Sequence, residues 1–166
     1  MLSDNLGDRK MMQLIVCRFL FFVLGTVLFG HHMTQAQSVD QEVIIKPVGN
    51  EVLFDTEEIT AKAGSRLKVV FNNVATNPAM RHNFVLLSVS PSDEVVIGQV
   101  GVGAVQAGES KDFIPENDAI LAYTKMADAG ELVEVEFTVP PPGDYVYLCT
   151  YFGHYVMMRG VLHSIN

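Results

Sequence analysis

Cysteine is scarce in this chain of 166 residues, which contains only Cys17 and Cys149. Cys17 lies in an apolar N-terminal segment of the kind that is removed on export, so Cys149 would then have no cysteine in its own chain to pair with. An unpaired thiol in an exported protein needs an explanation other than a structural disulfide, and metal ligation supplies one.

Positive charge is also in short supply, with 11 Lys and Arg against 19 Asp and Glu and a formal net charge of −8. Without residues 1–36, 8 basic and 17 acidic residues remain, a net charge of −9. Binding to nucleic acid needs clustered Lys or Arg and is excluded by this balance. A basic protein partner would instead be steered toward the chain.

Apolar runs long enough to span a membrane comfortably are missing, and the longest run belongs to a predicted signal peptide over residues 1–36. Its apolar core, residues 19–30, follows three basic residues and is followed by a plausible cleavage site at Ala36. These features predict export to the periplasm or the extracellular space. An uncleaved N-terminal anchor is the alternative, because the apolar stretch counted from Leu14 approaches spanning length with Arg18 as its interruption.

The rest of the chain, residues 37–166, reads as one domain of short strands. The clearest strand is 131–139, where acidic and apolar residues alternate with a period of two. Turn residues separate the strands, and such a pattern predicts a sandwich or barrel. Strand-like runs occupy residues 42–48, 50–54, 58–61, 66–73, 81–87, 119–125, 131–139, 145–148 and 159–162.

One helix is expected between two of these strands. Ser90 is the predicted N-cap and Pro91 the first helical residue, with acidic residues in the first turn. Gly98, Gly101 and Gly103 lower the helix propensity of the segment. A short or irregular helix is therefore predicted.

A thiol, an imidazole and a thioether follow one another closely near the C-terminus, at Cys149, His154 and Met158, on a turn between two strand-like runs. A soft thiolate beside an imidazole suits copper or zinc, and a thioether as a further weak ligand favours copper. A trigonal site for electron transfer needs a second histidine from a rigid element. His82, which opens a strand-like run after Asn77-Pro78, is the candidate.

The spacing Cys-x4-His-x3-Met of these residues resembles the ligand loop of the azurin and auracyanin branch of the cupredoxins, the small blue copper proteins. The resemblance covers roughly residues 41–166 and implies an all-β Greek-key β-sandwich with one inserted helix. It also implies that His82, Cys149, His154 and Met158 ligate one mononuclear type 1 copper ion, and that Asn83 ties the strand of His82 to the ligand loop. The sequence departs from the azurin pattern at Arg81, where azurins have Gly, and at Phe152, where the family usually has Pro.

These residues predict an exported carrier of single electrons, with no catalytic residues of its own. The resemblance implies brief docking to redox proteins, such as a c-type cytochrome or a reductase or oxidase, through an apolar patch for which the candidates are Phe152, Tyr155, Met157 and Met80. Contact with a membrane is expected only if the leader is retained.

Other functions stay open at this point. The first alternative is a module that stores or delivers copper without transferring electrons. An enzyme subunit resembling copper nitrite reductases or multicopper oxidases would need further histidine clusters and a longer chain. A zinc protein is also compatible with the ligand types.

Overall fold

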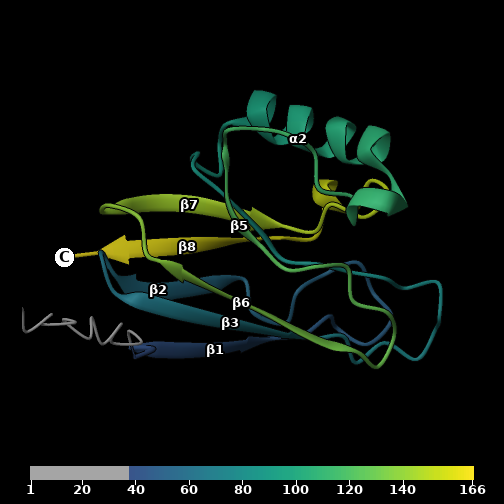
Figure 1. Ribbon diagram of the computed structural model, residues 1–166, viewed down its shortest axis with the longest axis horizontal. Helices are drawn as coiled ribbons and strands as arrows, with labels where there is room; N and C mark the ends of the chain where they lie inside the picture. Colours follow the sequence, from purple (N-terminus) through teal and green to yellow (C-terminus); the bar gives the residue numbers. More distant parts are fainter. Residues whose placement is uncertain (1–37) are drawn as a thin grey trace, which may run out of the picture. The chain divides into compact units, whose positions relative to one another are not determined.

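Two β-sheets make up most of the part of the chain that the computed structural model describes, residues 38–166 (Figure 1). The predicted signal peptide lies outside the described residues. A three-stranded sheet has the order β1-β3-β6 and a five-stranded sheet the order β2-β8-β7-β4-β5. The strands are β1 (Gln41–Ile45), β2 (Glu58–Lys62), β3 (Arg66–Asn72), β4 (Val85–Leu87), β5 (Ile120–Tyr123), β6 (Leu132–Thr138), β7 (Gly143–Leu148) and β8 (Arg159–Ile165).

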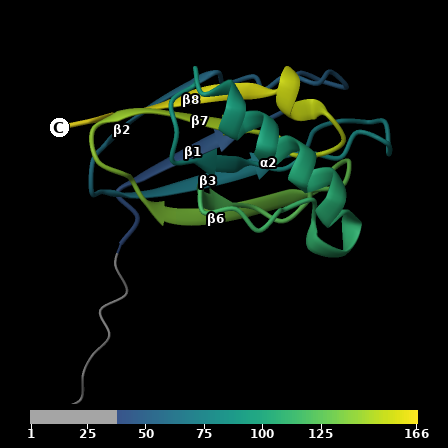
Figure 2. The ribbon, with the colours of Figure 1, turned by 90° about the horizontal axis from the view of Figure 1, so that it is seen from above.

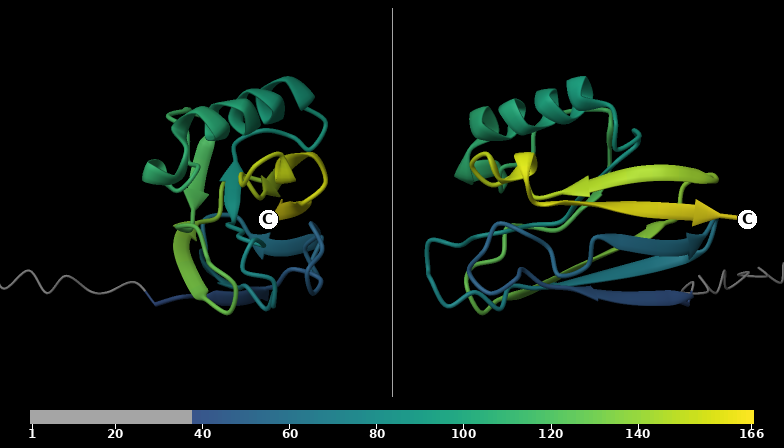
Figure 3. Two further views of the ribbon diagram at one scale, coloured as in Figure 1. Left: turned by 90° about the vertical axis from the view of Figure 1, so that its right-hand side faces the viewer. Right: turned by 180° about the vertical axis from the view of Figure 1, so that it is seen from behind.

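Both sheets are mixed. β1 pairs with β3 and β2 pairs with β8 in parallel, whereas the remaining pairs are antiparallel. The first four strands alternate between the sheets, with β1 and β3 in the three-stranded sheet and β2 and β4 in the five-stranded sheet. The two sheets form layers that face each other (Figure 3). The predicted all-β sandwich with one helix is confirmed.

The core between the layers follows from the alternation of side chains along the strands. In β3, Leu67, Val69 and Phe71 are buried, and β6 contributes Val133 and Phe137 to the same cluster. The charged residues between them face outward, where Lys68 pairs with Glu134 and Arg66 with Glu136 across the two strands. The period-two pattern that predicted the strand at 131–139 thus separates core from solvent.

Helix α2 (Glu94–Ala107) covers the outer face of the five-stranded sheet (Figure 2). Ile97 and Val100 pack there against β4 and β7, in a cluster with Val85, Leu87, Val146 and Leu148. Because β4 and the second half of β7 are covered on both faces, they are apolar at consecutive positions instead of alternating. Within residues 38–166, none of the helices is long and apolar enough to cross a membrane.

The helix departs from the sequence-based prediction in its start and in its regularity. Asp93 is the N-cap, and its side chain accepts a hydrogen bond from the Val96 N–H at 3.1 Å. Ser90 instead begins a turn in which its carbonyl accepts from the Asp93 N–H. The prediction of Ser90 and Pro91 at the helix start was therefore wrong. The helix is a continuous 14 residues despite its glycines, because burial of its inner face outweighs the propensity cost.

Two predicted strands are also shorter or absent. Residues 50–54 contain only the isolated bridge between Pro47 and Phe54, and the strand predicted over 81–87 is restricted to β4. His82 precedes β4 and forms a separate bridge with Ala127. Two short 3-10 helices complete the chain, η1 (Glu109–Lys111) after α2 and η2 (His154–Val156) in the loop between β7 and β8.

Candidate metal centre

The loop between β7 and β8, residues 149–158, lies at one end of the sandwich (Figure 1). The segment that carries His82 meets this loop. Cys149 directly follows β7 and is completely buried. His154 opens η2, and His82 enters from the bridge to Ala127. Three of the four residues predicted as metal ligands therefore come together although His82 is 67 residues from Cys149 in sequence.

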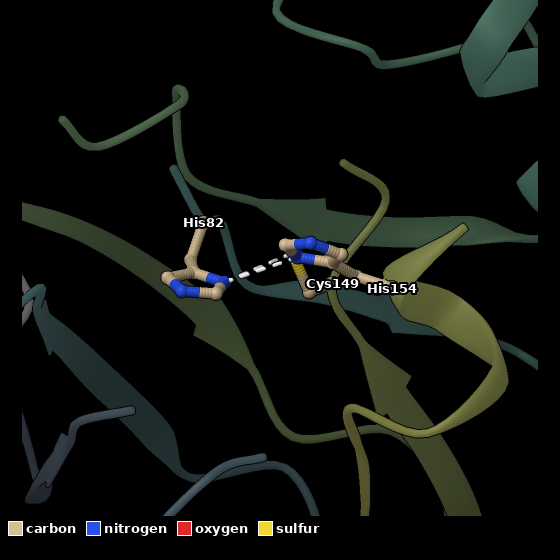
Figure 4. Close-up of side chains that lie close together, drawn as sticks. All are labelled: His82, Cys149 and His154. Carbon is tan, nitrogen blue, oxygen red and sulfur yellow. Dashed lines mark hydrogen bonds between the residues drawn. The ribbon is translucent and has the colours of Figure 1, made fainter. Parts of the chain in front are cut away.

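The three side chains present their donor atoms to one another (Figure 4). The Nδ1 atoms of His82 and His154 are 3.2 Å apart. The Sγ atom of Cys149 lies 3.8 Å from Nδ1 of His82 and 3.6 Å from Nδ1 of His154. Nε2 of His82 is buried without a hydrogen-bond partner among residues 38–166, so the polar contacts of this ring are directed at the cluster.

The loop folds back on itself, which brings Met158 beside Cys149. The Met158 N–H donates to the His154 carbonyl at 2.8 Å, and the Cys149 N–H donates to the Met158 carbonyl at 3.0 Å. Gly153 takes the left-handed conformation with φ of +77°, which favours glycine at the point where the loop turns into η2. Met158 is fully buried in the core cluster that contains Cys149.

The donor triangle has the size that a metal ion requires. A point about 2.1 Å from all three atoms lies within it, close to the 2.0–2.1 Å of metal–nitrogen bonds and slightly short of the 2.3 Å of metal–sulfur bonds at zinc sites. Two imidazoles and a thiolate suit copper or zinc better than hard cations such as magnesium. The cluster of His82, Cys149 and His154 could form a single mononuclear copper site.

Burial disfavours every charged form in this cluster. It lowers the pKa of His82 to about 4, with a smaller contribution from the neighbouring His154, and it lowers the pKa of His154 as well. It raises the pKa of the Cys149 thiol to about 12, against the lowering effect of backbone hydrogen bonds from Asn83 and Tyr151. Metal binding at neutral pH should therefore displace a proton from Cys149 and find both imidazoles neutral.

These shifts predict how the metal-free protein responds to acid. The pKa of His82 falls from 6.5 to about 4 on folding, so between these values the unfolded chain binds more protons. His82 therefore leaves the free energy of unfolding unchanged above pH 6.5. As the pH falls toward 4, the unfolded chain binds a proton that folded His82 does not, and the free energy of unfolding decreases by up to about 3 kcal/mol. Urea unfolding of metal-free protein at several pH values measures this loss.

Carboxyl groups also titrate near pH 4, so a variant without His82 is needed to isolate the contribution of His82 to the loss of stability. Metal-free His82→Gln should lose less stability between pH 6.5 and pH 4 than metal-free wild type. Equal losses in the two proteins would contradict the assigned role of His82 in the acid response.

Asn83 connects the His82 segment to the ligand loop, as the resemblance implied. Its Nδ2 donates to the Thr150 hydroxyl and its Oδ1 accepts from the Thr150 N–H, both at 2.8 Å and both buried. Asn83 follows His82 and Thr150 follows Cys149, so the hydrogen bonds between Asn83 and Thr150 hold together the two segments that carry these predicted ligands.

Arg81, the residue in place of the azurin glycine, is paired with two carboxylates. Its Nε lies 2.6 Å from Asp128 and its Nη1 lies 2.7 Å from Glu109, while the guanidinium sits 6.0 Å from the centre of the Tyr151 ring. The positive charge beside the site is therefore compensated locally. The side chain links η1 and the turn at Asp128 to the ligand loop.

Exposed apolar residues lie on both sides of His154 in the loop sequence, and His154 itself is half-buried. Phe152, Val156 and Met157 are each at least 60% exposed. Tyr155, one of the predicted patch residues, instead packs beneath α2, where only a glycine fits at position 101. Met80 is half-buried. The apolar patch of this protein is therefore defined by Phe152, Val156 and Met157, of which Val156 had no signal in the sequence.

Comparisons with known proteins agree with this geometry. The sequence profile described as copper binding proteins, plastocyanin/azurin family, matches residues 41–163. Auracyanin-A of Chloroflexus aurantiacus is 34% identical over 115 residues, which cover 69% of this chain and 68% of that protein. Azurin-1 of Alcaligenes xylosoxydans xylosoxydans is 31% identical over 134 residues, which cover 75% of this chain and 99% of that protein.

Solved structures show the same likeness. The "blue" copper protein auracyanin A of Chloroflexus aurantiacus aligns with a TM-score of 0.69 at 31% identity, covering 75% of this chain and 98% of that chain. Reduced auracyanin from Roseiflexus castenholzii aligns with a TM-score of 0.68 at 34% identity, covering 78% of this chain and 98% of that chain.

Proposed function

The chain belongs to the plastocyanin/azurin family of copper-binding proteins, and from this premise we propose that it is an exported blue copper protein that carries single electrons between redox partners. Auracyanins and azurins are blue copper proteins that act as electron carriers. The observation that carries the proposal is the convergence of one sulfur and two imidazole nitrogens within 3.8 Å at one end of a rigid sandwich.

The proposed ligands are His82, Cys149, His154 and Met158. A bound copper ion supplies a centre that accepts and releases one electron. Cys149 and His82 are completely buried and would keep water away from the ion, and Met158, buried beside Cys149 by the fold of the loop, would be the further weak ligand.

Fast electron transfer requires ligands that move little between the two oxidation states, and this chain's residues favour such stiffness. A backbone hydrogen bond joins Cys149, which directly follows β7, to Met158, which directly precedes β8. The Asn83–Thr150 pair joins the His82 segment to the same loop. The three segments that would hold the metal are thus connected to one another by hydrogen bonds.

The exposed patch of Phe152, Val156 and Met157 beside His154 is the proposed docking face. Exposed apolar patches bordered by polar surface mark interaction sites, and redox encounters bury little area, so the complexes should be brief. We propose a c-type cytochrome or a reductase or oxidase as partner, with the net negative charge of residues 37–166 favouring a basic one.

Export is part of the proposal. The leader over residues 1–36 would direct the chain to the periplasm or the extracellular space, and residues 37–166 would form the mature domain. Contact with a membrane would follow only if the leader were kept as an anchor.

Visible absorption and electron spin resonance spectra of the purified protein with Cu(II) test the proposal directly. We expect an intense visible band from a copper–thiolate bond, its loss on reduction by one electron, and its return on oxidation. A copper complex without that band, or one that gives up its metal readily to a weak chelator, would favour storage or delivery over electron transfer. Zinc bound in preference to copper would overturn the proposal.

A further inference from the structure

Asn73 lies just after the end of β3 and nine residues before His82, and its side chain is completely buried. No spacing or motif in the sequence distinguishes it from the other asparagines. A buried amide must find partners for two donor hydrogens and an acceptor oxygen, because each unpaired group costs free energy.

Every polar group of Asn73 has a partner. Its Nδ2 donates to the Met80 carbonyl at 2.8 Å and to the Ala127 carbonyl at 3.0 Å. Its Oδ1 accepts from the Ala75 N–H at 3.2 Å. Its backbone N–H donates to the Glu131 carbonyl at 2.9 Å, and its carbonyl accepts from the Gly130 N–H at 2.7 Å.

Two of these partners flank His82. Met80 is two residues before His82 in the chain, and Ala127 is the residue with which His82 forms its isolated bridge. The bridge itself consists of two hydrogen bonds, from the His82 N–H to the Ala127 carbonyl at 3.2 Å and from the Ala127 N–H to the His82 carbonyl at 2.8 Å. The Ala127 carbonyl therefore accepts from both His82 and Asn73.

His82 needs this support because it is outside any strand. β4 begins only at Val85, and an isolated bridge gives less restraint than a ladder. Asn83 restrains the segment toward the ligand loop through Thr150. Asn73 restrains it on the side of β3 and β6, where its own backbone is anchored to the turn at residues 130 and 131.

We propose that Asn73 is a positioning residue for the metal centre, which holds Nδ1 of His82 at its place beside Cys149 and His154. The inference rests on the proposed function, since it assigns Asn73 a part in ligand geometry. A metal site requires its ligands within about 0.5 Å of their working positions, and outer hydrogen bonds of this kind commonly change metal affinity by about 10–100-fold.

The test uses Asn73→Ala and the milder Asn73→Ser, whose hydroxyl keeps one donor. The matched control is Ser164→Ala, which removes a partly buried hydrogen bond, from the Ser164 hydroxyl to the Pro140 carbonyl at 2.6 Å, near the end of β8 away from the ligand loop. Each variant is measured in the full chain for thermal unfolding, for Cu(II) and Zn(II) affinity by competition, and for the imidazole resonances of His82 in the metal-free protein.

We expect Asn73→Ala to weaken affinity for both ions by about 10–100-fold and to broaden or shift the His82 resonances, with smaller effects in Asn73→Ser. Ser164→Ala should lower the melting temperature and leave both readouts unchanged. Wild-type affinity and wild-type His82 resonances in a folded, destabilised Asn73 variant would overturn the proposal. Failure of both Asn73 variants to fold would also overturn it, because the residue would then serve fold stability alone.

Failure of the proposed function is distinguishable from failure of this inference. If the wild-type chain formed no blue copper centre, the electron-carrier function would fall. The His82 resonances of the metal-free proteins would still report whether Asn73 positions the ring.

Discussion

Replacing Cys149 by serine is expected to abolish the visible band of the Cu(II) protein and to weaken copper binding by at least about 100-fold. Cys149 is the one cysteine among residues 38–166, and its sulfur completes the donor triangle with the two imidazoles. Serine has nearly the same shape, but its hydroxyl is a hard and poorly ionised donor that cannot form a copper–thiolate bond. Absorption spectroscopy and copper competition measure both effects.

The matched control removes a sulfur that lies outside the cluster. Met157→Leu replaces an exposed thioether next to Met158, and it should leave the band and the affinity unchanged. A band that survived Cys149→Ser, or one that vanished in Met157→Leu, would contradict the assignment of the thiolate.

Replacing Gly160 by alanine is expected to destabilise the domain by about 2–4 kcal/mol. Gly160 lies opposite Tyr147 in the β7–β8 pair, and an added Cβ would be 2.6 Å from Cε2 of the tyrosine ring and nearer still to its hydroxyl end. The ring cannot retreat, because it is fully buried against Phe54 and Phe84 and its hydroxyl donates to the Thr56 carbonyl at 2.6 Å. Chemical unfolding of the metal-free protein measures the loss.

Gly98→Ala is the control for this prediction. Gly98 lies within α2 with no atom within 4 Å of an added Cβ, so alanine should stabilise the helix by up to about 1 kcal/mol. If Gly160→Ala were as stable as wild type, Tyr147 would have room that the structure does not show.

Helix α2 has a part in the site as well as in the core. Its Gly101 leaves space for Tyr155, the residue after His154, and its first residue, Glu94, pairs at 2.8 Å with Arg159, the residue after Met158. The Arg159 Nε also donates to the Tyr155 carbonyl. The helix therefore braces both ends of the segment that carries His154 and Met158, and a displaced helix would disturb the loop.

The loop of residues 149–158 was predictable from the sequence because its geometry is local. Cys149, His154 and Met158 lie within ten residues, and the spacing together with Gly153 allows only a tight loop between two strands. The strand at 131–139 was predictable for a similar reason, since one face meets the core and the other meets solvent. His82 could be predicted as a candidate ligand from its place in the sequence, but whether it lies near Cys149 depended on the fold, because the two residues are far apart along the chain.

The tertiary structure alone decided what depends on contacts between distant segments. The burial of β4 and β7 beneath α2 erased their alternation, and packing under that helix removed Tyr155 from the exposed patch. Arg81 pairs with Asp128 and Glu109, which lie dozens of positions away in the sequence. Asn73 likewise binds the carbonyl of the distant Ala127, the bridge partner of His82. Sequence periodicity reports which face of an element is buried, whereas it carries no record of which distant group a buried donor or charge will meet.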